Sequence, residues 1–265
     1  MQIGFLGAGK MAEAILSAMV NAEMVQPWEV TACDKSEARR NLLASTYEVV
    51  VTDDPLLTVK ESKVLVLAVK PQDLDALLDQ VAPALKTTHL VISIAAGKTL
   101  KVLRSHLGPK PRLVRVMPNL ALMAGEGMSV YCPDGKIKAS DAALVERIFG
   151  AAGAAIRLEE KHFDAVTALS GSGPAYVAFF LKAMIDAGIA LGLPKEEARL
   201  MGEQTLIGTG IYLQQSGRDL DEFIQAVCSP KGTTEAGMKV LNKSTLPKTI
   251  AKTLEATAKR SAELA

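Results

Sequence analysis

The sequence predicts a doubly wound α/β domain with a mostly parallel sheet, followed by an all-α domain. Over residues 1–158, short runs of Val, Ile and Leu alternate with amphipathic stretches, which is typical of parallel strands covered by helices on both faces. A glycine-rich turn joins the first apolar run to the first amphipathic stretch. Strand-like runs then stop near residue 158, and helical patterns occupy residues 159–265.

The strands of the first domain are expected at seven apolar runs. In chain order these are IGFLG, EVTACD, VLVLAV, LVISIA, RLVRVM, GMSVYC and AAIRL. Helices are expected over residues 11–22, 36–45, 74–84, 100–107 and 139–149, where apolar side chains recur at helical spacing. This alternation indicates one sheet of Rossmann type with helices on both faces.

The second domain is expected to mediate dimerisation. Its most apolar window, residues 175–191, contains Lys182 and Asp186, whose charges are costly in hydrocarbon. A helix buried in protein is therefore expected there, and not a membrane span. Because one helical domain cannot cover a helix that is apolar on nearly all sides, we expect a homodimer with twofold symmetry, or a larger assembly.

Composition narrows the partners to small molecules. Thirty basic and 29 acidic residues leave a net charge of +1, which gives no general attraction to nucleic acid or to an anionic membrane. The three cysteines form no CxxC pair and there are three histidines, so no metal site is expected. Free cysteines suit a reducing cytoplasm, and the first residues, MQIGFLGAGK, resemble neither a secretory nor a transit peptide.

The turn GFLGAGKMA has the spacing of a dinucleotide-binding loop. Gly7, Gly9 and Ala12 stand at G-x-G-x-x-A positions between a strand and a helix. Gly7 permits the tight turn, Gly9 lets a pyrophosphate approach the backbone, and Ala12 lets helix and strand pack closely. The start of the helix offers free N–H groups and a partial positive charge to the phosphates. Residues 1–158 are therefore predicted to bind a dinucleotide.

The end of the second strand leaves the identity of the nucleotide open. Asp34 suits the 2′-hydroxyl of an NAD ribose. In contrast, Lys35 and Ser36, followed by Arg39 and Arg40, could hold the 2′-phosphate of NADP. The three basic side chains are equally typical of a solvated helix start.

Two further strand ends should face the same crevice, because ligands of open α/β sheets bind beyond the carboxyl ends of strands. LAVKPQ ends one strand and SIAAGK ends the next, so these turns are expected to line the nicotinamide half. Lys70 is a candidate for a role in the site, since Pro71 fixes the turn beside it. An ordinary exposed lysine is the alternative.

A second glycine run, ALSGSGPAYVAF, is not expected to bind phosphate. It follows a helical pattern, no Lys-Ser/Thr pair comes after it, and Pro174 lacks a backbone donor. We interpret it as a junction between two helices, with Pro174 at the first helical position and Ser172 or Gly173 as the cap. The small residues should allow segments to approach closely, and Gly173→Val is expected to disturb folding or dimer packing.

The loop CSPKGTTEAG brings hydroxyl groups and free backbone N–H groups to a helix start near Glu235. Ser229, Thr233 and Thr234 supply the hydroxyls, which suits a small carboxylate site. Taken alone, the pattern is better explained by a simple capped helix start.

Together these motifs resemble the pyrroline-5-carboxylate reductases, which make proline by reducing a cyclic imine with NAD(P)H. The resemblance rests on GFLGAGKMA, LAVKPQ, SIAAG, RVMPN, LSGSGPAY and CSPKGTT, in that order and across nearly the whole chain. Related reductases of the hydroxyacid type carry a catalytic lysine after a different glycine motif, and LSGSGPAY contains no lysine.

The resemblance implies NADPH, with NADH possible, as the cofactor, and a substrate held between the nicotinamide and the loop of residues 229–234. Helices of two subunits would complete the pocket. Thr234 would hydrogen-bond the ring nitrogen, and Lys70 is kept as a second catalytic candidate. The expected cofactor-binding residues are Leu6, Gly7, Ala8, Gly9, Lys10, Met11, Asp34, Lys35, Ser36, Ala68, Val69, Lys70, Pro71, Ala95, Ala96 and Gly97. The expected substrate-binding residues are Ser229, Gly232, Thr233 and Thr234.

Three positions depart from the family pattern. Pro55 replaces an asparagine near the adenosine, Lys231 replaces the first glycine of S-P-G-G, and Leu120 replaces the threonine after MPN. Pro55 puts the contact with the adenosine in question, whereas Lys231 and Leu120 leave open a related cyclic imine or a 3-hydroxy acid as substrate. A dimer that senses the dinucleotide without catalysis is the remaining alternative.

None of the three histidines lies inside a site motif. A cyclic imine is basic enough to arrive protonated or nearly so, and its reduction then needs little acid catalysis.

Overall fold

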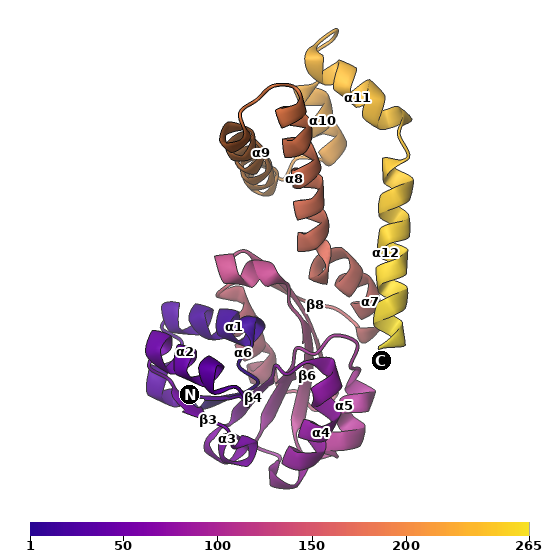
Figure 1. The fold of residues 1–265 in the computed structure, drawn as a ribbon. Helices are drawn as coiled ribbons and strands as arrows, with labels where there is room; N and C mark the ends of the chain where they lie inside the picture. The colour runs from indigo at the N-terminus through magenta and orange to yellow at the C-terminus, as the bar shows by residue number, and fades with distance from the viewer. Residues whose placement is uncertain (265) are drawn as a thin grey trace. The chain divides into compact units, whose positions relative to one another are not determined.

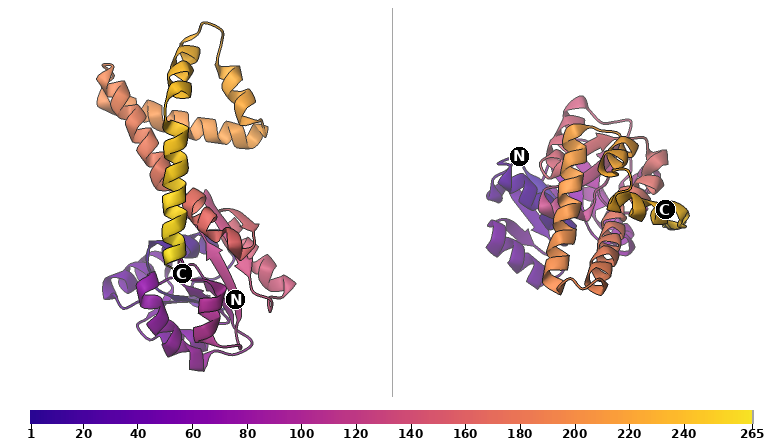
Figure 2. Two further views of the ribbon diagram at one scale, coloured as in Figure 1. Left: turned by 90° about the vertical axis from the view of Figure 1, so that its right-hand side faces the viewer. Right: turned by 90° about the horizontal axis from the view of Figure 1, so that it is seen from above.

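The computed structural model describes residues 1–264 and forms two compact units. The first comprises residues 1–174 together with residues 255–264, and the second comprises residues 175–254. Figure 1 shows the chain as a ribbon with its elements labelled, and Figure 2 gives two further views. The first unit contains the sheet, whereas the described residues of the second unit are helical or lie in turns between helices.

The first unit is built on an eight-stranded sheet. Its strands are β1 (Ile3–Leu6), β2 (Val30–Cys33), β3 (Val50–Thr52), β4 (Val64–Leu67), β5 (Leu90–Ser93), β6 (Arg112–Met117), β7 (Gly127–Pro133) and β8 (Gly153–Arg157). Their order across the sheet is β3-β2-β1-β4-β5-β6-β7-β8, and only the β6 and β7 pair is antiparallel. The chain therefore changes direction across the sheet between β1 and β4, and ligands of such sheets bind at the carboxyl ends of those strands.

Helices cover both faces of this sheet (Figure 1). They are α1 (Lys10–Asn21), α2 (Glu37–Tyr47), α3 (Pro55–Glu61), α4 (Pro71–Val81), α5 (Leu100–Leu107), α6 (Ala139–Gly150) and the short α7 (Phe163–Val166). Ile3 and Phe5 of β1 pack on the side of α1, α2 and α6, whereas Leu6 packs on the side of α3, α4 and α5. Because both faces are buried, the strands are nearly continuous apolar runs, as the sequence indicated.

The predicted fold class is confirmed, and all seven expected strands are present. Helix α5 spans residues 100–107 as expected, and the other expected helices begin and end within three residues of their predicted limits. The sequence reading missed β3 and α3, which lie between α2 and β4. Strand β3 lies at the edge of the sheet and has only three residues, of which Val50 is exposed. Such a short run does not differ enough from the flanking sequence to be recognised as a strand.

The compact units divide at a different place from the boundary expected near residue 158. Phe163 and Val166 are buried against Val130 and Cys132 of β7, so residues 159–174 belong with the sheet. The end of α12 (Leu246–Glu263) belongs there as well. The buried hydroxyl of Ser261 donates to Asp164 Oδ1 at 2.7 Å.

The second glycine run lies between two helices, as the sequence suggested. A π-helical turn, Thr167–Gly171, follows α7, and α8 begins at Gly173, one residue before the expected start. A Cβ atom at Gly171 would lie 2.4 Å from Cε of Met117, whereas one at Gly173 would meet no atom within 4 Å. The close approach within the chain is therefore at Gly171. A Cβ atom at Gly173 is accommodated within one chain, and its effect on dimer packing stays a prediction.

The second unit contains α8 (Gly173–Ala190), α9 (Lys195–Ser216), α10 (Leu220–Val227), α11 (Thr233–Lys243) and the first half of α12. Helix α9 packs on α8 at Gly202, where an added Cβ atom would lie 2.9 Å from Ile185. Tyr212 and Phe223 join α9 to α10 with ring centroids 5.5 Å apart. No residue of α8 is buried within this one chain, which agrees with the expectation that one helical domain cannot cover this helix.

Candidate functional site

The first glycine-rich turn connects β1 to α1 and passes close to the end of β4. Gly7 has a φ of 104°, and a Cβ atom there would lie 2.7 Å from the backbone of Ala68 and Val69. Only glycine fits this position, because a side chain would clash and would strain the backbone. The N–H of Gly7 donates to the carbonyl of Cys33 at 2.8 Å, which also ties the turn to β2.

The start of α1 is suited to an anion. Gly9 is its N-cap and provides no side-chain hydrogen bond, so the first N–H groups of this 12-residue helix keep their capacity to bind a ligand. A Cβ atom at Gly9 would meet no atom within 4 Å, so the backbone there is open to close approach. A pyrophosphate fits such a site, because the N–H groups and the helix dipole both favour negative charge.

The end of β2 is tied to the glycine-rich turn. Asp34 Oδ2 accepts the N–H of Ala8 at 2.7 Å, and Asp34 Oδ1 accepts the N–H of Ser36 at 2.9 Å. Arg39 and Arg40, the two candidate arginines for a 2′-phosphate, are engaged with the protein. Arg39 Nε donates to the carbonyl of Ala8 at 2.7 Å, and Arg40 Nη1 donates to the carbonyl of Asp34 at 2.8 Å.

A cleft of about 490 Å³ gathers the ends of β1, β2 and β4. Eight of the predicted cofactor residues line it: Leu6, Gly7, Gly9, Asp34, Lys35, Ala68, Val69 and Lys70. Pro55, the departure near the expected adenosine position, lines it too. Lys70 is exposed at the N-cap of α4, and Pro71 follows as the first helical residue.

The other eight predicted cofactor residues lie outside the lining of this cleft. Ala8, Lys10 and Met11 belong to the turn and to α1, Ser36 caps α2, and Pro71 begins α4; the others, Ala95, Ala96 and Gly97, form the turn after β5. Gly97 has a φ of 76°, and a Cβ atom there would lie 2.6 Å from Cβ of Leu264. Leu264, the residue after α12, therefore packs on this turn.

The sequence reading missed one wall of the cleft, the face of α4 that carries Asp73, Ala76, Leu77 and Gln80. These positions follow i, i+3, i+4, i+7 spacing, which marks one face of a helix. That periodicity, applied to the helix after LAVKPQ, could have predicted them.

Cys33 and Asp53 also line the cleft and were not predicted. Burial raises the pKa of the Cys33 thiol, and the nearby carboxylates of Asp34, Asp54 and Asp53 raise it further, against a hydrogen bond with Thr58 that lowers it. The thiol is therefore neutral at physiological pH and is not an activated nucleophile.

The predicted substrate loop forms a compact turn between α10 and α11. The N–H of Gly232 donates to the carbonyl of Ser229 at 2.9 Å, and a Cβ atom at Gly232 would lie 2.8 Å from Ser229 Oγ. Gly232 is the N-cap of α11, and Thr233 and Thr234 are its first two residues. The structure thus brings all four predicted substrate residues together at one helix start.

Lys231 occupies a position that favours glycine. Its φ is 60°, in the left-handed region, which costs a non-glycine residue about 1–2 kcal/mol. Its N–H donates to Glu235 Oε2 at 2.8 Å, which stabilises the turn. The departure from the family glycine therefore keeps the backbone turn and adds a long cationic side chain to it.

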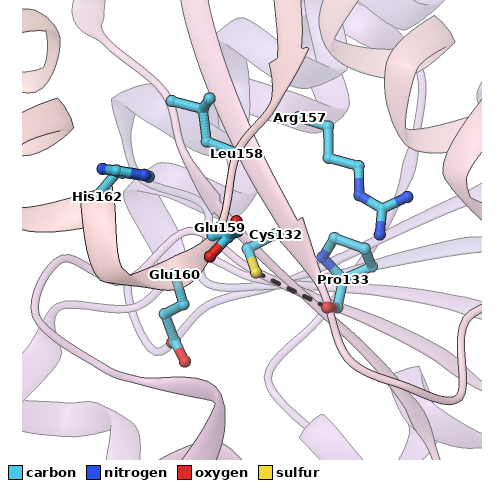
Figure 3. A pocket seen from close by; sticks show the side chains of 7 residues that line it. All are labelled: Cys132, Pro133, Arg157, Leu158, Glu159, Glu160 and His162. Atoms are coloured by element: carbon cyan, nitrogen blue, oxygen red, sulfur yellow. Dashed lines mark hydrogen bonds between the residues drawn. The ribbon is translucent and has the colours of Figure 1, made fainter.

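A second cavity of about 520 Å³ lies beside β7 and β8 (Figure 3). Cys132, Pro133, Arg157, Leu158, Glu159, Glu160 and His162 line it. Glu160 is already bound by Arg115 at 3.0 Å and by the N–H of Leu100 at 2.7 Å, and Figure 3 shows Arg157 and His162 on opposite sides. Because its charged groups do not converge, this cavity is a weaker candidate than the cleft.

Within residues 1–264, no cluster of three or more His, Cys, Asp or Glu side chains is arranged to hold a metal ion. One described helical stretch, Glu160–Ala190, is long and apolar enough to cross a membrane by length and composition alone. One such helix is weak evidence for a membrane span, because core helices of soluble proteins meet the same criterion.

Comparisons with known proteins match the chain along almost its full length. The curated pyrroline-5-carboxylate reductase of Glycine max is 38% identical over 263 residues, which cover 99% of this chain and 95% of that protein. The chain belongs to the pyrroline-5-carboxylate reductase family. The reductase of Synechocystis sp. is 37% identical, with 99% of this chain and 98% of that protein covered.

Models of two protein families match separate parts of the chain. Residues 160–264 match a family described as pyrroline-5-carboxylate reductase dimerisation, and residues 2–97 match one described as NADP oxidoreductase, coenzyme F420-dependent. The second match contains the cleft-lining ends of β1, β2 and β4. The first contains the compact turn of residues 229–234.

Solved structures of the reductase family share the whole fold. The enzyme from Coxiella burnetii aligns with a TM-score of 0.93 at 31% identity, covering 100% of this chain and 98% of that one. The Plasmodium falciparum enzyme, solved with NADP bound, aligns with a TM-score of 0.90 at 28% identity, with the same coverage.

Proposed function

We propose that this protein reduces 1-pyrroline-5-carboxylate to L-proline with NADPH, the last step of proline biosynthesis. The observation that carries the proposal is the likeness to curated pyrroline-5-carboxylate reductases across 99% of the chain. That span includes both the dinucleotide cleft of the first unit and the substrate turn of the second.

The cleft fits a dinucleotide by its own geometry. Gly7 lets the turn pass against Ala68, and the uncapped start of α1 offers N–H groups to a pyrophosphate. Asp34 and Lys35 lie at the end of β2, where the adenosine ribose is expected. When bound, NADPH supplies the hydride that reduces the imine carbon.

The turn between α10 and α11 is proposed to hold the substrate. Backbone N–H groups from Gly232 to Thr234 would take the carboxylate, since the first N–H groups of a helix have no partner within it. Thr234, which is half-buried, would hydrogen-bond the ring nitrogen. Helices of a second subunit would complete this pocket.

Reduction of this imine requires little acid catalysis from the residues of the protein. Reduction adds a hydride to the imine carbon and leaves a proton on the nitrogen, and the imine is basic enough to bring that proton with it. The main task of the residues is then to hold donor and acceptor in reach. Lys70, exposed at the edge of the cleft, is retained as a second candidate for contact with the reacting groups.

Steady-state oxidation of NADPH and of NADH, each with 1-pyrroline-5-carboxylate, tests the proposal. We expect turnover with this imine to exceed that with a panel of other cyclic imines and of keto acids, the oxidised partners of hydroxy acids. The panel matters because Lys231 places a cation on the substrate turn. Binding of NADPH without turnover of any member would instead indicate a dinucleotide-sensing dimer.

Thr234→Ala should lower kcat/KM for the imine by about tenfold or more, the factor for losing one hydrogen bond to a charged group. The dissociation constant of NADPH should stay within about twofold, because Thr234 is assigned to the substrate. Enzyme kinetics and nucleotide fluorescence measure the two quantities. Thr205→Ala is the matched control, since that hydroxyl donates to Met201 within α9. A large loss of NADPH affinity in Thr234→Ala would contradict the assignment.

The setting that we propose is a cytoplasmic homodimer or larger assembly acting on a small molecule, without nucleic acid or membrane. The family match described as dimerisation, over residues 160–264, supports the assembly. The balanced charge of the chain, +1, agrees with a small-molecule partner.

A further inference from the structure

Ala8, between the two glycines of the nucleotide turn, is held on both sides by charged side chains. Its N–H donates to Asp34 Oδ2 at 2.7 Å, and its carbonyl accepts from Arg39 Nε at 2.7 Å. Ala8 is fully buried, so water does not compete for these two groups. Hydrogen bonds to charged partners are stronger than neutral ones, and here they fix both polar groups of one residue.

Arg39 also reaches the helix that follows the turn. Its Nη2 donates to Glu13 Oε2 at 2.7 Å, and Glu13 lies in the first turn of α1. Both side chains are largely removed from water, with exposures of 26% and 16%. One guanidinium from α2 thus binds the glycine-rich turn and the start of α1 at the same time.

We infer that Arg39 is a positioning residue for the pyrophosphate turn and not a ligand of the 2′-phosphate. The inference rests on the proposed function, because it takes the turn to bind a nicotinamide dinucleotide. Two of its donor groups are aimed at Ala8 and Glu13, and the Glu13 carboxylate neutralises its charge. Lys35, which lies in the same segment and lines the cleft, can meet a 2′-phosphate together with Ser36.

The positioning role has a distinct thermodynamic consequence. If the turn is held in its binding conformation by Arg39, then loss of Arg39 lowers the fraction of protein that is competent to bind, and the apparent affinity falls by that fraction. NADPH and NADH have the same pyrophosphate, so both should lose affinity by the same factor. If Arg39 instead bound the 2′-phosphate, its loss would lower the affinity for NADPH alone, because NADH has no 2′-phosphate.

The test measures dissociation constants of NADPH and NADH by nucleotide fluorescence in Arg39→Met and Arg39→Lys. We expect both constants to rise about tenfold in each variant, with their ratio unchanged within about twofold. Lysine can replace arginine as a point charge for a phosphate, but it cannot donate from Nε and Nη2 at once. Arg147→Met, which removes an exposed arginine of α6, is the matched control and should leave both constants unchanged.

A rise confined to NADPH, or full NADPH affinity in Arg39→Lys, overturns the inference. Hydrogen–deuterium exchange of the ligand-free protein is a second test of whether Arg39 holds the glycine-rich turn, and it does not depend on catalysis. Exchange should increase in the peptide covering residues 6–12 of Arg39→Met and Arg39→Lys and stay unchanged over β5 and β6. Unchanged exchange in residues 6–12 also overturns the inference. If the protein failed to reduce the imine, the proposed function would be wrong. The nucleotide affinities and the hydrogen–deuterium exchange would still test the role of Arg39.

Discussion

Among single residues, His89 shows how burial sets an ionisation state. It is 5% exposed, in the turn before β5, and its Nδ1 accepts the N–H of Lys86 at 2.9 Å. Burial lowers the pKa of the imidazole below its ordinary value of 6.5, and the positive charges of Lys86 and Arg112 lower it further. At neutral pH the imidazole of the folded protein is therefore uncharged, and Nε2 carries its proton.

His89 should make the protein less stable in mild acid. Its pKa is lower in the folded than in the unfolded chain, so below about pH 6.5 the unfolded chain binds more protons and the free energy of unfolding falls as pH falls. This decrease continues until the pH passes the folded pKa. His89→Gln keeps an acceptor near Lys86 and removes this titration. Urea unfolding at about pH 7.5 and about pH 5.5 measures the effect.

The loss of stability between those two pH values should be smaller in His89→Gln than in the wild type. Equal losses would contradict the account of His89. Other groups titrate in the same range, but they are common to both proteins and cancel in the comparison.

Individual site residues could be predicted from the sequence where their role follows from the spacing of a local motif. Gly7, Gly9 and Asp34 follow from a motif and from the end of a strand, and all three line the cleft. Arg39 could not be assigned, because a basic residue in the first turn of α2 can point to solvent, to a phosphate or to the protein. Its partners Ala8 and Glu13 lie 31 and 26 positions away.

Among the elements, α12 links the helical unit to the sheet unit along the chain. Its end belongs to the first unit, where Ser261 is bound to Asp164, and Leu264, the residue after α12, packs on Gly97. Gly97 lies in the turn after β5, which the sequence assigned to the nicotinamide half of the cofactor. Leu264 can pack this closely on the turn only because Gly97 has no side chain.

Gly97→Ala should lower the free energy of unfolding by more than the cost of its backbone conformation. An added Cβ atom would lie 2.6 Å from Leu264 Cβ and 3.0 Å from its carbonyl carbon, which adds a steric cost of about 1–3 kcal/mol. Gly108→Ala is the matched control. Gly108 has a similar φ of 65°, ends α5, and has no atom within 4 Å of an added Cβ. Urea unfolding of both variants gives the difference.

Shortening the chain to end at residue 263 should remove most of the excess cost of Gly97→Ala, because the clashing residue is gone. The double variant then shows non-additive energies, as expected of residues in contact. Additive effects would mean that Leu264 and Gly97 do not press on each other in solution.

The elements were largely predictable, and the exceptions have physical causes. Long apolar runs identified the buried strands, whereas β3 is a three-residue edge strand with little apolar signal. The units defined by contacts include residues 159–174 and the end of α12 with the sheet. Those contacts join positions about 30 and 97 residues apart, such as Cys132 with Phe163 and Asp164 with Ser261, and no local pattern records them.

For the whole molecule, the main feature is apolar surface that a single chain leaves uncovered. No residue of α8 is buried, and Phe179 is 76% exposed. The sequence predicted this feature, because one helical domain cannot cover a helix that is apolar on nearly all sides. The family match described as dimerisation includes the whole of α8 and indicates that another subunit covers it.

Phe179→Glu should dissociate the assembly, because it places a charge where an apolar side chain is expected to be buried between subunits. Size-exclusion chromatography with light scattering should give at least twice the mass of one chain for the wild type and a lower mass for the variant. Trp28→Glu, which changes a 71% exposed aromatic side chain of the first unit, is the matched control and should keep the wild-type mass. Because subunit association stabilises the folded state by mass action, the melting temperature of the wild type should also rise with protein concentration. A Phe179→Glu protein with the wild-type mass, or a wild-type protein recovered only in detergent, would show that α8 is covered in another way.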